Sequence, residues 1–351
     1  MKRKILIFTP GGAGGAERMS VLIGKLLPKD HFDVRFVVIG RLRKIYNIIP
    51  DDYPIDCIPV RNRYAFSTLR IWWKIIHENP DIVFTSQIAY NPRVIIAARL
   101  AGKKVIVRSS GMIGTYKHCV FQGVKLTYPL ANLIIAQQED MRNEIILLLK
   151  IPSKKVKTIH NPLDYENIDK LSKADSPFPN DGNLNFVEVA SINHRKAQDV
   201  AIKAFSIVHQ SISKSRLYIV GPYDNNSSYF QEINTLISEL HLNGKVHFVG
   251  YDKNPFRWMK NADCFIFPSR NEGLPNALIE ASYLRTPCAA ARCLNIVDEI
   301  IKDGKNGFVI DVDDIGGLAQ AMMKAVSLKE CKMIYHPSSY HDFVKLFDSI
   351  S

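Results

Sequence analysis

Short apolar runs alternate with helical patterns along the chain. The first run, Lys4–Thr9, is followed by a glycine-rich turn and by an amphipathic pattern from Ala16 to Leu27. Short apolar runs bounded by turn residues are typical of buried strands, and apolar positions three or four apart are typical of helices. Strands that alternate with helices predict a parallel sheet covered on both faces.

This alternation continues and then starts again after residue 183. In the first half, further strands are expected at Val34–Ile39, Ile82–Thr85, Lys104–Arg108 and Leu133–Ala136. In the second half, strands are expected at Asn185–Ala190, Arg216–Val220, Val246–Gly250, Asp263–Pro268, Cys288–Ala291 and Gly307–Ile310. The predicted fold class is therefore α/β, with two Rossmann-like doubly wound domains facing a central cleft, in which ligands bind beyond the carboxyl ends of the strands.

The composition of the chain places the expected domain boundaries. A length of 351 residues suits about two domains. Residues 172–183 are rich in Ser, Pro, Asn and Asp, as linkers are. We therefore expect a first domain at 1–171, a linker at 172–183, a second domain at 184–334, and a tail at 335–351 that crosses back to the first domain.

Positive charge is concentrated in the first half. The net charge is +12, and residues 1–175 carry 28 Lys and Arg against 15 Asp and Glu. A one-sided basic domain indicates an anionic partner such as lipid head groups, a lipid-linked pyrophosphate or nucleic acid. No recognisable nucleic-acid module accompanies the charge, so we expect no nucleic acid partner.

The sequence offers no signal for secretion, a membrane span or a metal site. The apolar run after the basic N-terminus is shorter than the ~7–15 residues of a signal peptide. No stretch approaches the ~18 apolar residues of a spanning helix. The six cysteines lack metal-binding spacing. We expect a cytoplasmic protein that has no metal and that can bind peripherally to the inner face of the cell membrane.

Residues 61–77 interleave Arg and Lys with Tyr, Phe and Trp. This pattern is typical of a helix that lies in a membrane interface. It equally fits a core helix whose aromatic side chains pack inward under a basic outer face. The basic first half favours anionic lipid, because clustered Lys and Arg bind such surfaces.

Three segments carry candidate chemistry. Gly14 and Gly15 belong to a glycine loop that precedes a helix, where backbone N–H groups can bind phosphate. Arg195 and Lys196 follow the first strand of the second half, and two adjacent cations suit a diphosphate. In Pro268–Ala281 a strand, a turn and a helix carry two glutamates, which are placed to bracket an elongated ligand.

The segment Pro268–Ala281 resembles the E-x7-E motif of retaining glycosyltransferases of family 4, which have the GT-B fold. The likeness extends along most of the chain. It includes the glycine motif at 14–17, the segment 158–164, the Lys-containing loop at 195–199 and the late segment 297–308. These motifs occur in the family's order and at suitable spacing.

The resemblance implies roles for individual residues. Glu272 would contact the donor sugar and Glu280 the ribose hydroxyls. Lys196, helped by Arg195, would neutralise the diphosphate together with the amides near Asn276 and Ala277. Gly14 and Gly15 would let the N-terminal loop reach the transferring centre. The family needs no metal, and the only Asp-x-Asp, Asp311–Asp313, is expected in a late turn far from these motifs.

Two departures from the family pattern affect the expected donor contacts. Ala190-Ser191-Ile192 replaces the usual Gly-Arg-Leu, so one diphosphate contact is lost or moved to Arg195. The family's mid-domain His is absent at Ser109-Ser110-Gly111, and either Ser110 or His118 is a candidate replacement.

The resemblance implies a retaining hexosyltransferase that uses a nucleotide diphosphate sugar, with UDP the expected nucleotide, and no further cofactor. The acceptor would be a lipid-linked or other glycan in cell-surface polysaccharide or glycan assembly, received by the first domain. Two alternatives stay open: a non-catalytic nucleotide-sugar-binding partner of a polysaccharide synthesis complex, and a GT-B nucleotide-sugar epimerase.

Overall fold

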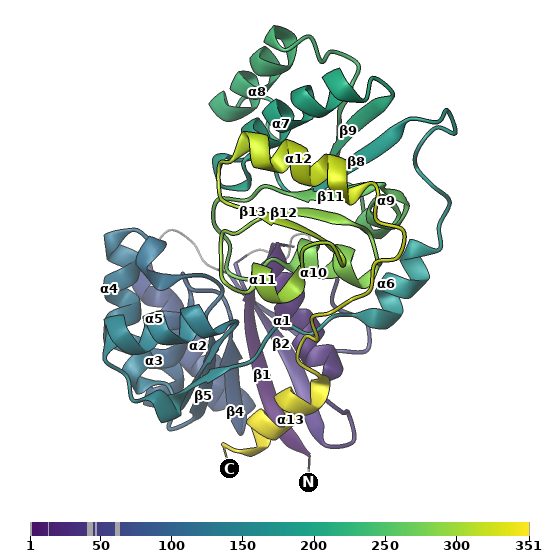
Figure 1. Cartoon of the computed structure of the whole chain (residues 1–351). Coiled ribbons are helices and arrows are strands. Elements are labelled where there is room, and N and C mark those ends of the chain that lie inside the picture. The colour runs from purple at the N-terminus through teal and green to yellow at the C-terminus, as the bar shows by residue number, and fades with distance from the viewer. Residues whose placement is uncertain (1, 13, 41–44, 46–47, 60–63, 351) are drawn as a thin grey trace. The chain divides into compact units, whose positions relative to one another are not determined.

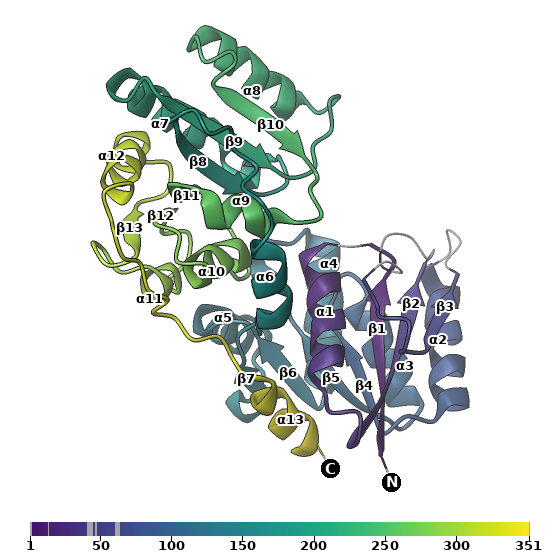
Figure 2. The ribbon, with the colours of Figure 1, turned by 90° about the vertical axis from the view of Figure 1, so that its right-hand side faces the viewer.

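The computed structural model describes residues 2–12, 14–40, 45, 48–59 and 64–350. The chain divides into two compact units (Figures 1 and 2). Unit 1 combines Met1–Pro162 with Pro337–Ser351, and unit 2 is Leu163–His336. Each unit is built on its own parallel sheet, as the two-domain α/β prediction requires.

In unit 1 the described residues form a parallel sheet of seven strands in the order β3-β2-β1-β4-β5-β6-β7. The strands are β1 (Arg3–Pro10), β2 (Phe32–Ile39), β3 (Ile55–Ile58), β4 (Ile82–Thr85), β5 (Lys104–Arg108), β6 (Leu133–Ala136) and β7 (Val156–Thr158). The helices are α1 (Gly15–Leu26), α2 (Tyr64–Glu78), α3 (Asn91–Leu100), α4 (His118–Thr127), α5 (Glu139–Leu149) and α13 (Tyr340–Asp348).

Helices cover both faces of this sheet because successive strand residues point to opposite sides. Leu6 and Phe8 of β1 belong to the cluster that includes α2, α3, α4 and α5. Ile5 and Ile7 belong to the cluster that includes α1 and α13. Through α13 the C-terminal segment is part of the core of unit 1, where Figure 2 shows it beside the unit 1 sheet.

In unit 2 the described residues form a parallel sheet of six strands in the order β10-β9-β8-β11-β12-β13. The strands are β8 (Leu184–Val189), β9 (Ser215–Val220), β10 (Val246–Gly250), β11 (Cys264–Phe267), β12 (Cys288–Ala291) and β13 (Gly307–Ile310). The helices are α6 (Tyr165–Ser172), α7 (Gln198–Ser211), α8 (Ser228–Glu239), α9 (Pro255–Asn261), α10 (Asn276–Tyr283), α11 (Val297–Ile300) and α12 (Ile315–Ala325).

The strand order of unit 2 reverses between β8 and β11, which are neighbours in the sheet although β9 and β10 lie between them in sequence. Helices α7, α8 and α12 pack on one face, and α9, α10 and α11 on the other. In an open α/β sheet the carboxyl ends of the strands at such a reversal form the usual ligand site. The loops after β8 and β11 both start from this place.

The boundary between the two units does not coincide with the linker that was expected at residues 172–183. The first unit ends at Pro162, and α6 belongs to the second. Leu163 and Ile168 are buried in the same cluster as Trp258 and Met259 of α9. The linker-like segment 173–183 therefore follows a helix that already packs in unit 2, since composition marks an irregular segment and not the point where packing changes.

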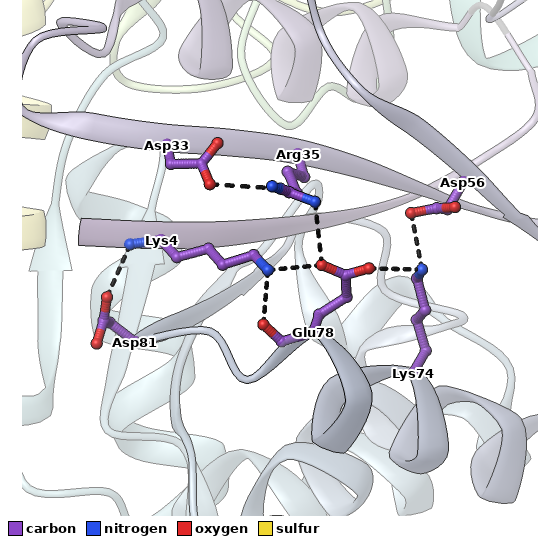
Figure 3. Close-up of polar contacts among 7 residues, drawn as sticks. All are labelled: Lys4, Asp33, Arg35, Asp56, Lys74, Glu78 and Asp81. Atoms are coloured by element: carbon purple, nitrogen blue, oxygen red, sulfur yellow. Dashed lines mark hydrogen bonds and ion pairs between the residues drawn. The ribbon is translucent and has the colours of Figure 1, made fainter. Parts of the chain in front are cut away.

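A charged cluster fixes the end of α2 in unit 1 (Figure 3). The Glu78 carboxylate accepts hydrogen bonds from Lys4 Nζ at 2.6 Å, Lys74 Nζ at 2.8 Å and Arg35 Nη1 at 3.3 Å. Lys74 also pairs with Asp56 at 2.8 Å. The hydrogen bonds from Lys4 and Lys74 lower the pKa of Glu78 to about 2. Lys74 is thus engaged within unit 1.

The described part of α2 turns apolar side chains outward. Leu69, Trp73 and Ile76 are exposed, whereas Ile71 and Ile75 are buried in the core. The ring of Trp73, 61% exposed, stacks on His77 with centroids 5.2 Å apart. The outer face of this part of α2 is mixed, because Arg70 and His77 are exposed beside these apolar side chains, and Trp72 packs against the core.

Candidate functional site

The loop after β8 forms the first wall of the site in unit 2. A short 3-10 turn at His194–Lys196 ends at Ala197, whose φ of 58° lies in the left-handed region. The Lys196 N–H donates to the Asn193 carbonyl at 2.9 Å, and α7 begins directly afterwards. The tight turn places both cations at the carboxyl end of β8.

Glu272, in the loop after β11, holds both cations. Its Oε1 pairs with Lys196 Nζ, and its Oε2 lies 3.3 Å from Arg195 Nη1. The Ser269 hydroxyl donates to Oε1 at 3.2 Å. The Glu272 residue is only 8% exposed. Charge-assisted hydrogen bonds are stronger than neutral ones, so these contacts fix the two loops against each other.

A second carboxyl group is buried next to this cluster. Glu188 lies near the end of β8, and its Oε1 accepts a hydrogen bond from Gln198 Nε2 at 2.7 Å. Its Oε2 has no hydrogen-bond partner among the described residues. Burial raises the pKa of Glu188 to about 8, against the opposing effect of the Lys196 charge. At pH 7 the group is therefore mostly neutral.

An arginine braces the same two loops. Arg270 pairs with both carboxylate oxygens of Asp199, through Nη1 at 3.0 Å and Nη2 at 2.7 Å. Its Nε donates to Asp313 Oδ1 at 2.7 Å, and its Nη1 to the His194 carbonyl at 2.8 Å. The bond to Asp199 raises the pKa of Arg270. Such a bidentate pair fixes geometry as well as charge.

One expectation about this region is wrong. Asp313 was expected in a turn far from the motif residues, but it contacts Arg270, two residues before Glu272. The cause is the parallel sheet: β13 lies two strands from β11, so the turn that follows β13 reaches the same edge. Sequence separation concealed this contact.

The aspartates of that turn have separate partners. Asp311 pairs with Arg292 at 2.8 Å, and Asp313 with Arg270. Asp314 caps α12 by accepting from the Gly317 N–H at 2.8 Å. Within the described ranges no group of three or more His, Cys, Asp or Glu side chains is arranged to hold a metal ion.

Helix α10 begins in the loop that carries Glu272. No side chain caps its N-terminus, and its first turn has no acidic residue. Asn276, Ala277 and Glu280 are partly exposed along it. An uncapped helix start with a positive dipole end favours an anion. This arrangement is compatible with the nucleotide roles that the resemblance implies for these residues.

The glycine loop lies in unit 1, and its glycines make room for a glutamate. A side chain on Gly12 or Gly14 would meet the Glu17 carboxylate at 3.0 or 2.9 Å, whereas Gly15 faces open space. Glu17 lies in the first turn of α1 and is largely buried. Its negative charge already complements this helix end, so a phosphate there would meet a like charge.

Neither of the two residues that could replace the absent family histidine lies in a cluster of charged side chains like the one around Glu272. His118 is exposed at the start of α4, 3.3 Å from the side chain of Gln122. Ser110 is partly exposed, with its hydroxyl 3.5 Å from Gln87 Oε1.

The structure therefore joins Arg195, Lys196 and Glu272 directly and places α10 after the same loop. The sequence analysis missed Glu188, Asp199 and the brace made by Arg270. Glu188 had left a signal, because it is a lone acid in the apolar strand at 185–190. Asp199 and Arg270 left no such signal in the sequence, because charged residues are common in loops and at helix starts.

Comparisons with known proteins agree with this architecture. The model of the family described as Glycosyltransferase Family 4 matches residues 13–167, and that of Glycosyl transferases group 1 matches residues 169–340. The chain is 17% identical to the Anabaena protein HepE, solved with UDP and glucose, at a TM-score of 0.82 over 99% of this chain and 100% of that one. At this identity the likeness shows the fold.

Two curated relatives are more similar in sequence. An uncharacterised glycosyltransferase of Methanocaldococcus jannaschii is 28% identical over 54% of this chain and 46% of its own length. The N-acetylgalactosamine-N,N'-diacetylbacillosaminyl-diphospho-undecaprenol 4-alpha-N-acetylgalactosaminyltransferase of Campylobacter jejuni is 26% identical over 89% of this chain and 86% of its own length. Taken with the two family matches, which follow one another along the chain, these findings show that the protein is a GT-B glycosyltransferase that belongs to glycosyltransferase family 4.

Proposed function

We propose that this glycosyltransferase moves a hexose or N-acetylhexosamine from a UDP-sugar, with retention, to a lipid-linked or other glycan acceptor in cell-surface polysaccharide or glycan assembly. The observation that carries the donor part is the pairing of Lys196 and Arg195 with Glu272 at the strand reversal of unit 2. The Campylobacter relative, whose name specifies a diphospho-undecaprenol acceptor, supports the acceptor part.

The proposed chemistry follows from charge. When the sugar leaves, negative charge grows on the nucleotide diphosphate. Fixed cations and helix N–H groups aimed at that position stabilise it without reorganising. Lys196, Arg195 and the start of α10 provide such groups. On this proposal transfer needs no metal ion.

The donor is tested by thermal denaturation with UDP, GDP, ADP and their sugar conjugates. A ligand that binds only the folded state raises the melting temperature by mass action. We expect selective stabilisation by UDP and its conjugates. Stabilisation by another nucleotide would replace UDP in the proposal, and no stabilisation by any of them would contradict the donor site.

Turnover is tested with the donor so identified and a prenyl-diphosphate-linked sugar. We expect transfer with retained anomeric configuration, unchanged by EDTA and lost in Glu272→Ala but kept in the surface control Glu239→Ala. Donor binding without transfer or hydrolysis would favour a non-catalytic partner, and conversion of the donor sugar without transfer would favour an epimerase. Loss of transfer on chelation would contradict the metal-free step.

We further propose that unit 1 binds an anionic membrane surface. Support comes from the exposed Leu69, Trp73 and Ile76 of α2 and from Ile96 and Leu100 of α3, a helix that packs on α2. The cations on or near the same helices include the exposed Arg70 and Arg99 and the partly exposed Lys103. Apolar side chains beside clustered cations are typical of interfacial binding. Among the helices of the described residues, none is long and apolar enough to cross a bilayer.

Vesicle sedimentation tests the membrane proposal. Arg70→Gln and Trp73→Gln should each reduce binding to vesicles of phosphatidylglycerol and phosphatidylcholine, whereas Lys154→Gln, an exposed change elsewhere on unit 1, should not. Equal binding by all variants would contradict it. Lys74 is unsuitable for this test because its ammonium pairs with Asp56 and Glu78.

A further inference from the structure

Strand β8 buries an acid beside the cations of unit 2. Glu188 is 2% exposed, and its neighbour across β9 is the fully buried Ile219. Val187 belongs to the cluster of α9, α10 and α11, and Phe186 to that of α7, α8 and α12. Because side chains alternate along a strand, Glu188 is turned toward α7. One of its carboxyl oxygens, Oε2, has no hydrogen-bond partner among the described residues.

A chain of hydrogen bonds joins Glu188 to the turn that carries Lys196. Gln198 Nε2 donates to Glu188 Oε1 at 2.7 Å, and Gln198 Oε1 accepts from the Asn193 N–H at 3.3 Å. The Asn193 carbonyl then accepts from the Lys196 N–H at 2.9 Å. The acid therefore lies directly behind the turn. A glutamine at this position could accept the same hydrogen bond from Gln198, so the bond by itself does not require an acid.

Glu188 and Lys196 influence each other through their charges. Burial raises the pKa of Glu188 to about 8, and the Lys196 charge opposes this effect. Attraction between charges is stronger in a buried place than in water. An ionised Glu188 would thus attract Lys196 and compete with any anion that binds it, whereas the neutral acid does not. The positive charge available near Lys196 depends on whether Glu188 holds its proton.

Charged groups on the neighbouring elements keep their charge in the alkaline range. Arg270 pairs with Asp199 of α7 and with Asp313 after β13. Burial opposes the ionisation of Asp199, but its hydrogen bonds to Arg270 and Tyr229 lower its pKa. Burial raises the pKa of Tyr229 on α8, and raises that of Cys293 after β12 to about 12, so both stay neutral.

We propose that donor binding is coupled to the protonation of Glu188: the neutral acid leaves the positive charge of Lys196 available to the diphosphate, and ionisation of the acid weakens donor binding. This coupling rests on the proposed function, in which Lys196 binds the diphosphate of the donor. Glu188 is then a positioning residue that acts through Lys196 and does not touch the donor. Because linkage is reciprocal, a bound diphosphate favours the neutral acid, so binding takes up a proton where the free protein has lost it.

Calorimetry of UDP binding between pH 7 and pH 9 in phosphate-free buffer tests the coupling. With a pKa of about 8 for Glu188, the affinity of the native chain should fall about three- to tenfold over this range. Glu188→Gln stays neutral, so it should lose most of this fall and bind UDP more tightly than the native chain at pH 9. The matched control Glu239→Gln, an exposed acid on α8, should keep the fall. His194→Gln, which removes the histidine of the turn, should keep it too. Titration of UDP itself affects all these proteins alike.

The proton provides a second readout. At pH 8 the free carboxyl is about half protonated, so UDP binding should take up as much as about half a proton. The uptake is obtained from the binding heats in Tris and in HEPES, because these buffers release different heats when they give up a proton. Glu188→Gln should take up correspondingly less. A purely structural role in supporting the turn would not change the number of protons bound.

The outcomes separate this coupling from the donor site. UDP affinity of the native chain that is constant between pH 7 and pH 9, or that falls as much in Glu188→Gln, overturns the coupling and leaves the donor site intact. Binding that Glu188→Gln weakens by one factor at every pH makes Glu188 a structural support and also overturns it. If no UDP, GDP or ADP binds at pH 7, the donor site is contradicted and the coupling falls with it. If Glu188→Gln does not fold, proton uptake by the native chain at pH 8 decides: its presence supports the coupling and its absence overturns it.

Discussion

Glu188→Gln should make unit 2 more stable at neutral and alkaline pH. Glutamine resembles the neutral acid in shape and can still accept a hydrogen bond from Gln198. The native carboxyl has an ordinary pKa of 4.5 in the unfolded chain and a pKa of about 8 when buried. Between these values the folded protein holds a proton that the unfolded chain has released. The stability of the native protein therefore falls as pH rises through this window.

The size of the effect follows from the two pKa values. Each pH unit between 4.5 and about 8 costs about 1.36 kcal/mol. The ceiling is thus about 3 kcal/mol at pH 7 and about 5 kcal/mol above pH 8. Local relaxation and water entry reduce such values, so we expect a gain of roughly 1–3 kcal/mol at pH 7. The gain should vanish near pH 4.5.

The chain offers a matched control of opposite sign in unit 1. The pKa of Glu78 is lowered to about 2, so its charged form stabilises the folded state above pH 4.5 and this stability is lost as pH falls toward 2. At pH 7 the ceiling is about 3 kcal/mol, and we expect Glu78→Gln to cost roughly 1–2 kcal/mol because the cluster lies at the surface. Asp52→Asn, which removes an exposed pair with Lys29, should change little.

Tryptophan fluorescence in urea can report each unit separately. The three tryptophans are Trp72 and Trp73 in unit 1 and Trp258 in unit 2. Changing the two on α2 to Phe leaves a reporter for Glu188→Gln, and Trp258→Phe leaves a reporter for Glu78→Gln. A destabilised Glu188→Gln at pH 9, or a difference from the native chain that does not grow between pH 5 and pH 9, would refute the reasoning.

Two further predictions concern the donor site. Lys196→Ala should weaken UDP binding about 10–100-fold and uridine binding less than twofold in calorimetry, because only the diphosphate needs the cation; equal losses would mean that Lys196 does not bind the diphosphate. Glu280→Ala should weaken UDP and uridine about equally and about tenfold, because the ribose is common to both, and an unchanged affinity for either would rule out its ribose role.

In unit 1 the central strands could be predicted from sequence and the edge strands β3 and β7 could not, whereas in unit 2 the edge strands β10 and β13 were predicted as well. Ile82–Thr85 and Leu133–Ala136 are wholly buried and, apart from Thr85, wholly apolar, so their bounds follow from the sequence itself. Strand β3 has one buried residue in Ile55–Ile58, and β7 has only Val156. In these two runs of three or four residues alternation could not be detected, because a period of two requires more residues.

The individual residues of the site could be predicted from the sequence, but the contacts between them could not. Glu272 and Lys196 were expected to act on the same donor, but 76 positions of sequence separate them, and their ion pair follows from the adjacency of β8 and β11. Sequence patterns give strands and loops, whereas strand order decides which loops meet. For the same reason Arg108 was predicted only as the end of a strand, although its buried guanidinium donates to Asn161, 53 positions later in the chain.

The net charge of the side chains around Lys196 decides how strongly this part of unit 2 attracts an anion. Two cations, Arg195 and Lys196, pair with one ionised carboxylate at Glu272. Because Glu188 is mostly neutral at pH 7, one positive charge remains in excess for an anion. An ionised Glu188 would cancel it, so the burial that destabilises unit 2 also preserves the attraction for the donor. On the proposed function a diphosphate would compete with Glu272 for both cations, and that exchange would release the Glu272 carboxylate to contact the sugar.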